Sequence, residues 1–312
     1  MGRKIANTKE MPREEWLALR RHSIGGSDAG AVLGMSQFAS PVTVYLDKTG
    51  MSKDKETSEA MRQGTDLEEY AAQRWMEKTG KKVRRDNFMY QHDDYPFITA
   101  NVDRDVIGEN AGLECKTTNN YNSYDFEGGE VPAYYYAQCQ HYMAVKGYDR
   151  MYLAVLVWGR EFHALTVERN DDFIRDMIEK ECDFWENYVE AKKMPAPDGS
   201  EATDEALKEL WPQSNGMEIQ DPKFDSDIRE YRELGDAIKR LKEQQNEVKE
   251  RLVIRLAEAE KGVGTDFYCT YKSSTRTSID TKKLQSDLPE IYNHYKKEST
   301  ARTLRTNVIK KQ

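Results

Sequence analysis

The sequence changes its periodicity at Gly80. Before it, residues 58–79 place Leu67, Ala71 and Trp75 four positions apart, which is a helical pattern that a glycine can end. After it, β-like runs occupy 83–85, 88–91, 97–103 and 112–117. A helical run at 134–146 and two apolar strands at 151–157 and 161–167 follow. Helices mixed with short strands predict an α/β domain whose mixed central sheet is flanked by helices.

The remaining segments suggest where the domains divide. Short helices are expected at 12–21, from Ser27 and at 41–48, and a longer one at 171–192. Residues 227–260 carry apolar side chains at mixed steps of three and four, which predicts a long amphipathic helix. We therefore expect a catalytic domain over 1–197, an acidic connection over 198–222, and a helical arm with a small cap over 223–312.

The charge distribution narrows the class of partner. The net charge of −8 argues against a protein that attracts nucleic acid with its whole surface. Residues 270–312 nevertheless hold ten Lys and Arg against four acids. This tail is a candidate DNA contact, although a solvated face is the commoner explanation for such a run: Lys282, Lys283, Lys296, Lys297, Arg302 and Arg305.

Two further classes of protein are disfavoured: membrane-spanning or secreted proteins, and proteins held by disulfides or structural zinc. No apolar run approaches the roughly 18 residues that a membrane span needs, and the first residues lack the apolar stretch of a signal peptide. The four cysteines are scattered, with no histidine at zinc-ligand spacing. We expect a soluble, cytoplasmic protein without membrane contact, disulfides or structural zinc.

One pattern carries phosphodiester chemistry. Asp103 closes one β-like run, and Glu114 and Lys116 lie two residues apart on the next. Residues i and i+2 of a strand share a face, so a hairpin brings the two acids together beside the lysine, while Cys115 points away. Carboxylates can hold a hard cation that polarises a phosphoryl oxygen, and a lysine can orient the attacking water.

That spacing alone is common by chance, and an exposed Glu and Lys on an edge strand would look the same. The residues around this motif strengthen its interpretation as a nuclease site. Glu68 lies on the preceding helix, and Gln138 and Tyr142 share one face of the following helix. The simpler alternatives are an exposed helix acid for Glu68 and ordinary core polar contacts for Gln138 and Tyr142.

In this order the motifs resemble the YqaJ-type viral recombinases, which are phage nucleases similar to lambda exonuclease within the PD-(D/E)xK superfamily. The resemblance covers about residues 12–190 and is specific only as a set. It rests on SIGGSDA from Ser23, GTDLE ending at Glu68, NVD ending at Asp103, LECK from Leu113 and QCQHY from Gln138. It implies a restriction-endonuclease-like core.

The resemblance also implies roles. Asp103, Glu114, the main-chain carbonyl of Cys115 and Glu68 would hold Mg²⁺ or Mn²⁺, and Lys116 would position the water. Gln138 would brace the lysine or the DNA strand, with Tyr142 beside it. The family commonly has Pro-Asp-Gly around the first acid, whereas this chain has Val102-Asp103-Arg104, so Asp105 remains a rival for that position.

A second pair is implied near the first turn. In lambda exonuclease-like enzymes an arginine and a serine hold the 5′-phosphate of the DNA end, and these positions match Arg20 and Ser27. An arginine fork and a hydroxyl beside a helix N-terminus suit an anion. The alternative is that Ser27 only caps its helix. His22 and His141 are expected to be surface or packing residues.

Taken with the resemblance, the sequence predicts a metal-dependent exonuclease that digests linear duplex DNA from 5′ to 3′ and leaves 3′ single-stranded tails for phage recombination. A single-strand annealing protein is the implied partner, and a homo-oligomer the implied assembly. The alternatives are an endonuclease with the same metal site and a non-catalytic DNA-binding or scaffold protein that works through the helical arm.

Overall fold

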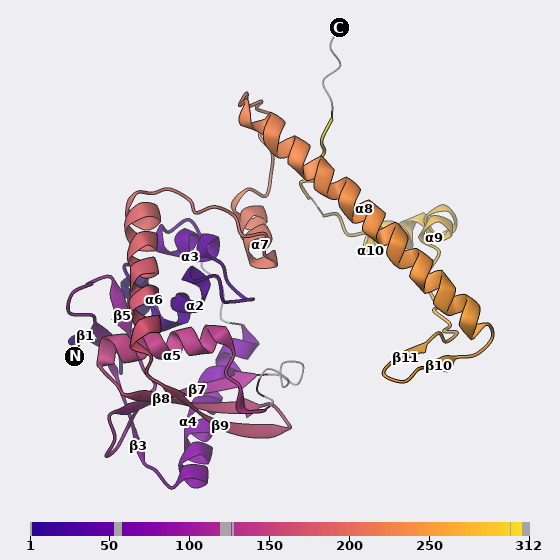
Figure 1. Cartoon of the computed structure of the whole chain (residues 1–312). Coiled ribbons are helices and arrows are strands. Elements are labelled where there is room, and N and C mark those ends of the chain that lie inside the picture. The colour runs from indigo at the N-terminus through magenta and orange to yellow at the C-terminus, as the bar shows by residue number, and fades with distance from the viewer. Residues whose placement is uncertain (1, 53–57, 119–125, 127, 300, 308–312) are drawn as a thin grey trace. The chain divides into compact units, whose positions relative to one another are not determined.

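The computed structural model describes residues 2–52, 58–118, 126, 128–299 and 301–307. The chain divides into two compact units, Met1–Leu210 and Trp211–Gln312. Figure 1 shows both units, and each is described here by itself.

The first unit is built on a five-stranded sheet. Its strands, in spatial order, are β3 (Val83–Arg85), β6 (Arg104–Val106), β7 (Ala111–Thr118), β8 (Arg150–Val157) and β9 (Glu161–Glu168). β7 and β8 run parallel, and the other neighbours are antiparallel. The sheet is therefore mixed, and the carboxyl ends of its two central long strands meet at one edge.

Helices α4 (Glu59–Thr79) and α5 (Ala133–Lys146) pack on the two faces of this sheet (Figure 1). Successive side chains of β8 alternate between two clusters, because strand side chains point to opposite faces. Tyr152 joins Trp75 of α4, and Leu153 joins Met143 of α5. α4 begins at the Ser58 cap, whose hydroxyl accepts from the Met61 amide, and ends at the left-handed Gly80.

A second, four-stranded sheet explains one difference from the sequence analysis. Its order is β1 (Arg3–Asn7), β4 (Phe88–Gln91), β5 (Ile98–Ala100) and β2 (Ile24–Gly25). The run 97–103 was predicted to be one strand paired with 112–117, but it stops at Ala100 and the chain then crosses to the other sheet. β7 pairs instead with β6, and Asp103 lies in the bend just before β6.

Five further helical segments complete the first unit: α1 (Arg13–Arg21), α2 (Gly26–Val32), α3 (Pro41–Lys48), α6 (Asp171–Phe184), which continues as the π-helix η2 (Trp185–Glu190), and α7 (Glu201–Leu210). α7 falls within the predicted acidic connection, yet it packs on the first unit. Its Thr203 hydroxyl donates to Ser40 at 2.8 Å, and Leu207 and Leu210 join an apolar cluster with α3. The acids of 201–209 are the outer face of an amphipathic helix.

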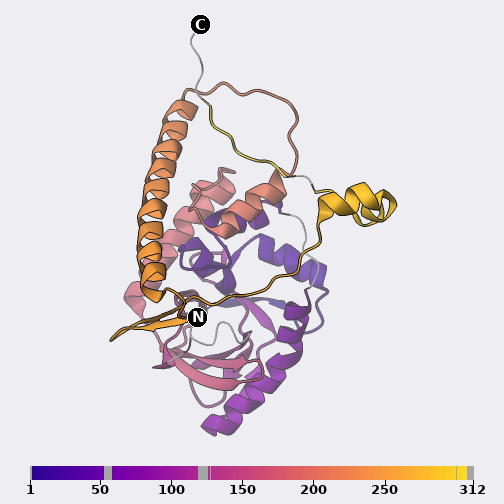
Figure 2. The ribbon, with the colours of Figure 1, turned by 90° about the vertical axis from the view of Figure 1, so that its right-hand side faces the viewer.

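The second unit contains the long helix α8 (Lys223–Leu256), a hairpin of β10 (Lys261–Val263) and β11 (Tyr268–Thr270), and the short helices α9 (Thr281–Asp287) and α10 (Pro289–Tyr295). Figure 2 shows α8 as a single straight helix. Among the described residues of this unit, only Leu256 is a buried apolar side chain. None of the helices described in either unit is long and apolar enough to cross a membrane.

Candidate active site

Glu114 lies at the centre of a buried group of polar side chains. On β7, Leu113 packs in the α4 cluster and Cys115 packs against it, so Glu114 faces α5. Its Oε1 accepts from Lys116 Nζ and from Gln138 Nε2, both at 2.8 Å. Its Oε2 is buried and has no hydrogen-bond partner among the described residues. A buried carboxylate with one unsatisfied oxygen is costly unless something else binds it.

Asp103 is brought to the same place from the bend before β6. The β6–β7 register pairs Arg104 with Leu113, and its continuation by one residue sets Asp103 beside Glu114. Asp103 Oδ2 accepts from the Cys115 amide at 2.7 Å. Burial, reinforced by the charges of Glu114 and Glu68, raises the pKa of Asp103 well above its ordinary value. Two acids held this close out of water repel each other, which a cation between them would relieve.

Lys116 and Tyr142 border the acids. Burial opposes the charge on Lys116, but the neighbouring Glu114 outweighs it and raises the pKa of the lysine, so Lys116 is a fixed cation. The Tyr142 hydroxyl accepts from Gln138 Nε2 at 2.8 Å. Burial and the charge of Glu114 raise the pKa of Tyr142, which stays protonated. The structure thus brings together five of the predicted residues.

Glu68 is connected to Asp103 through a buried arginine. Its Oε1 accepts from Arg104 at 2.5 Å, and the same guanidinium reaches Glu69 at 3.2 Å and the Asp103 carbonyl at 2.9 Å. Glu68 is therefore neither a solvated helix acid nor a direct neighbour of Glu114. Arg104, which the sequence analysis missed, is the buried residue that links α4 to the bend carrying Asp103. Its partners are 35 and 36 residues away, so no local pattern marks it.

Asp105, the rival for the first acid, is engaged elsewhere. It pairs with Gly112 in the β6–β7 ladder, and its carboxylate accepts from the Tyr148 hydroxyl and from Arg84 at 3.1 Å. Burial acts against ionisation, but Tyr148, Lys146 and Arg84 together lower the pKa of Asp105. The two acids do not share an environment, and only Asp103 lies with Glu114 and Lys116.

The pair predicted to hold a terminal phosphate is also assembled. Arg20 of α1 donates to the Ser27 hydroxyl at 2.6 Å and reaches Asp28 at 3.3 Å. Ser27 does not cap α2, because Gly25 is the N-cap residue, and the Gly25 amide donates to Asp28. Lys48, whose side chain is 0% exposed, donates to Asp28 at 2.7 Å and to the Arg20 carbonyl at 3.0 Å. Burial would raise the pKa of Asp28, but Lys48 and Arg20 hold it below its ordinary value.

A glycine connects this pair to the acids. A Cβ on Gly26 would lie 2.4 Å from the Tyr142 ring, so the close approach of α2 to α5 requires a glycine at this position. Ser27 is the next residue, and Tyr142 contacts Gln138, which holds Glu114. The predicted residues of both groups therefore form one continuous region of the first unit.

The donor set is compatible with a hard cation. The carboxylates of Asp103 and Glu114 are oxygen ligands, and the unsatisfied Glu114 Oε2 can accept a cation. Within the described part of the chain, no three His, Cys, Asp or Glu side chains are gathered closely enough to bind a metal by themselves. A cation here would need the main-chain carbonyl, water or the phosphate to complete its shell, as Mg²⁺ commonly does.

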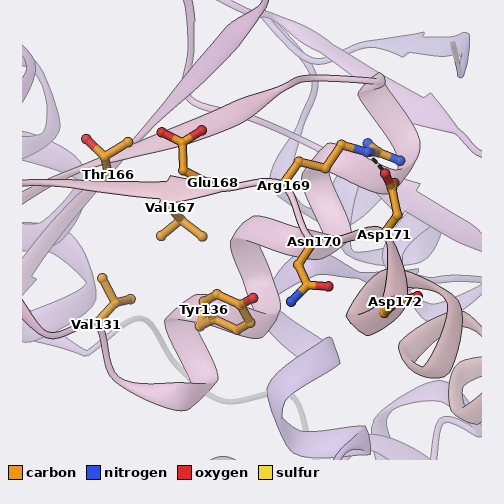
Figure 3. Close-up of a pocket in the computed structure, with 9 residues that line it drawn as sticks. All are labelled: Val131, Tyr136, Thr166, Val167, Glu168, Arg169, Asn170, Asp171 and Asp172. Atoms are coloured by element: carbon orange, nitrogen blue, oxygen red, sulfur yellow. Dashed lines mark hydrogen bonds and ion pairs between the residues drawn. The ribbon is translucent and has the colours of Figure 1, made fainter.

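A separate groove of about 510 Å³ lies where β9 leads into α6 (Figure 3). Figure 3 shows Tyr136 and Val167 on its wall and Arg169 paired with Asp171 at 2.6 Å. It contains none of the residues around Glu114. We therefore take the candidate active site from the polar cluster and not from this groove.

Comparison with known proteins identifies the family of this chain. Residues 15–149 match the YqaJ-like viral recombinase domain. The uncharacterized protein YqaJ of Bacillus subtilis strain 168 is 38% identical over 300 residues, which are 95% of this chain and 94% of that protein. This chain belongs to the YqaJ family. The family match spans Arg20, Ser27, Glu68, the acids, Lys116, Gln138 and Tyr142.

Among solved structures, the alkaline exonuclease LHK-Exo in complex with dAMP has a TM-score of 0.50 and 22% identity, covering 57% of this chain and 93% of that chain. The LHK-Exo structure from Laribacter hongkongensis without that ligand gives a TM-score of 0.49 over the same shares. The fold predicted from the sequence is confirmed. The family agrees with the predicted place in phage-type recombination, and the fold is shared with an alkaline exonuclease.

Proposed function

We propose that this chain is a metal-dependent exonuclease that digests linear duplex DNA from 5′ to 3′ and leaves 3′ single-stranded tails. The observation that carries the proposal is Glu114: a buried carboxylate held by Lys116 and Gln138, beside Asp103, with one oxygen free. Fixed charges in a site shielded from water are what stabilisation of a phosphoryl transition state requires.

Asp103, Glu114 and the main-chain carbonyl of Cys115 would hold Mg²⁺ or Mn²⁺, with Glu68 supporting Asp103 through Arg104. The cation supplies Lewis acidity toward the scissile phosphate. Lys116 keeps its proton and offers a positive charge to the developing negative charge. Gln138 fixes the Glu114 carboxylate, and Tyr142 fixes Gln138, so both position the site.

The 5′ end would be held by Arg20 and Ser27. Arg20 is oriented by Asp28, and Asp28 by the buried Lys48, so the guanidinium is placed before DNA arrives. Its bond to Ser27 supports this role, because it holds the two groups close enough to contact one anion together. A terminal phosphate would replace this bond with two charge-assisted ones.

Assembly is part of the proposal. On α8 an apolar seam advances by steps of three and four, with one step of seven after Leu241. It is formed by Tyr231, Leu234, Ile238, Leu241, Val248 and Leu252, all between 41% and 64% exposed. Such a seam is typical of coiled coils. We propose that a second copy covers it. If Ile238 meets the partner's Leu241 in an antiparallel pair, Tyr231 meets the partner's Val248, and these two layers are apolar, whereas Leu234 meets the partner's Gln245.

In a bacterial host cytoplasm, the 3′ tails would pass to a single-strand annealing protein. This step rests on the family of recombinases and on the product of a 5′ to 3′ digestion. The exposed basic residues of 282–305 are the candidate surface for the DNA backbone.

The proposal is tested with end-labelled linear duplexes, with and without a 5′-phosphate, and a closed circle, each incubated with Mg²⁺. We expect release of 5′ nucleotides from the phosphorylated linear duplex and no cutting of the circle. Lys116→Ala should lower the rate by about 10²- to 10⁴-fold, the range expected for loss of a catalytic charge. Arg20→Ala should reduce the preference for a 5′-phosphate. Cutting of the circle would indicate an endonuclease, and full activity of Lys116→Ala would overturn the site.

A further inference from the structure

A second groove opens directly beside Lys116, at the sheet edge where β7 and β8 end. It has a volume of about 380 Å³ and is lined by residues of α4, α5 and both strand ends. We call it the aromatic groove and define it by Phe38, Tyr134, Tyr135, Trp158, Gln63 and Thr117. Its position follows from the parallel pairing of β7 with β8, which brings Thr117 and Trp158 to the same edge.

The aromatic side chains of this groove leave large surfaces uncovered. Phe38 is 60% exposed and Trp158 is 55% exposed. Phe38 packs edge-on against Tyr134 with ring centroids 5.6 Å apart, and Tyr134 contacts Tyr135 at 4.3 Å. Large exposed aromatic surfaces grouped around a hollow mark a binding site more often than a structural one. The mutual packing of Phe38, Tyr134 and Tyr135 keeps these three rings fixed, which lowers the entropy that they lose on binding.

The groove is continuous with the candidate active site. Lys116 Nζ lies 5.1 Å from the centroid of the Tyr135 ring. Thr117 follows Lys116 on β7, and Tyr134 lies four residues before Gln138 on α5, so one helical turn separates the two sites. A DNA strand whose phosphate is beside Lys116 therefore has its neighbouring nucleotides within reach of the groove.

The residues that line the groove suit the bases of a nucleotide and not its phosphate. Among the described residues that line this groove there is no Lys or Arg, so this lining offers no positive charge to attract a phosphate. The rings offer faces for stacking, and Gln63 and Thr117 offer polar groups. Bases of an unpaired strand have the matching chemistry, because every base has a flat face that stacks on an aromatic ring. Paired bases inside a duplex are stacked on one another and present only their edges to a groove.

We propose that the aromatic groove binds unpaired bases of the DNA strand whose phosphate is at Lys116, by stacking on Phe38 and Trp158. This inference rests on the proposed function and deepens it: the groove stabilises an opened duplex end, so that the strand to be cut is separated from its complement.

Binding without turnover tests the groove independently of catalysis. The probes are a hairpin duplex whose 5′-phosphorylated end carries four unpaired nucleotides with one 2-aminopurine, and the same hairpin with a fully paired end, both in EDTA. Phe38→Ala and Trp158→Ala should each weaken binding to the unpaired end by about 10-fold, from the usual contribution of base stacking. Both should also diminish the quenching of 2-aminopurine, while binding to the paired end changes by less than about 2-fold.

Matched variants complete the experiment. Trp158→Phe should retain quenching, and Trp211→Ala, which removes an equally exposed tryptophan of the second unit, should change neither measurement. Equal loss of binding to paired and unpaired ends, or no loss at all, would overturn the proposal. Hydrolysis by the unaltered chain is measured in parallel: if it cuts duplex DNA while the groove variants bind normally, the groove fails and the nuclease stands.

Discussion

The two units of this chain differ in which side chains they bury and which they expose. The first unit buries Lys48, Glu114, Lys146 and Glu181, each beside an oppositely charged or polar partner. In the second unit, the described ion pairs lie at the surface, and the apolar seam of α8 is exposed. Buried, fixed charges suit catalysis, whereas an uncovered apolar seam suits association. This difference underlies our proposal that the first unit carries the chemistry and the second unit the assembly.

The largest effect on stability should come from a buried pair of the first unit. Lys48→Met leaves Asp28 buried with only the more distant Arg20 as a counter-charge. We expect the free energy of unfolding to fall by about 3 kcal/mol, as when one partner of a buried ion pair is removed. The measurement is urea unfolding followed by circular dichroism.

The matched control is in the second unit. Lys296 contacts Glu298 at 2.5 Å, but both side chains are exposed. Lys296→Met should cost less than about 1 kcal/mol, because water already solvates both charges. Similar losses for Lys48→Met and Lys296→Met would remove the contrast between the units.

A smaller effect should follow pH through His141. This side chain is 0% exposed and bonds Glu181 and the Thr99 carbonyl, both at 2.8 Å. Burial opposes its charge, but Glu181, the Thr99 carbonyl and the more distant Asp28 raise the pKa of His141 above 6.5. The raised pKa stabilises the fold fully below pH 6.5, and this contribution is lost as the pH rises toward the folded pKa.

The free energy of unfolding should therefore fall above pH 6.5 by up to about 1.4 kcal/mol per pH unit, the limit for one proton. The control is His141→Gln with Glu181→Gln, which removes both charges and keeps a polar pair. His92 is present in both proteins, so its contribution to the pH dependence of the unfolding free energy is the same in both. An equal pH slope in the two proteins would contradict the assignment.

A substitution on α8 should have the smallest effect on stability and the largest effect on assembly. Leu241→Glu places a charge in the middle of the seam, which a second copy could not cover without burying it. Sedimentation equilibrium should show the mass falling to that of a single chain, while the unfolding free energy of the first unit changes by less than about 0.5 kcal/mol. Ile254→Glu, an exposed position outside the seam, should leave assembly intact. A monomeric unaltered chain would refute the pairing of α8.

Much of the fold could be predicted because its signals are local. The Ser58 cap and Gly80 bound α4 as their types suggest, and the steps of three and four along α8 mark a helix whatever covers it. β1 was missed because its Arg-Lys-Ile-Ala-Asn sequence is polar and largely exposed, and only its pairing with β4 makes it a strand. The helix α7 was read as a connection because its acids conceal the apolar side that packs on α3.

The sequence by itself determined which residues could do the chemistry. The alternation of β7 sends Glu114 and Lys116 to one side and Cys115 to the other, and that depends on two-residue periodicity alone. The tertiary structure decided everything that depends on distant partners. It placed Asp103 in a bend between two sheets, turned Asp105 toward Tyr148, engaged Glu68 with Arg104, and set Lys48 beneath Asp28. The physical reason is that a buried charge is positioned by the group that compensates it, and that group is rarely its neighbour in sequence.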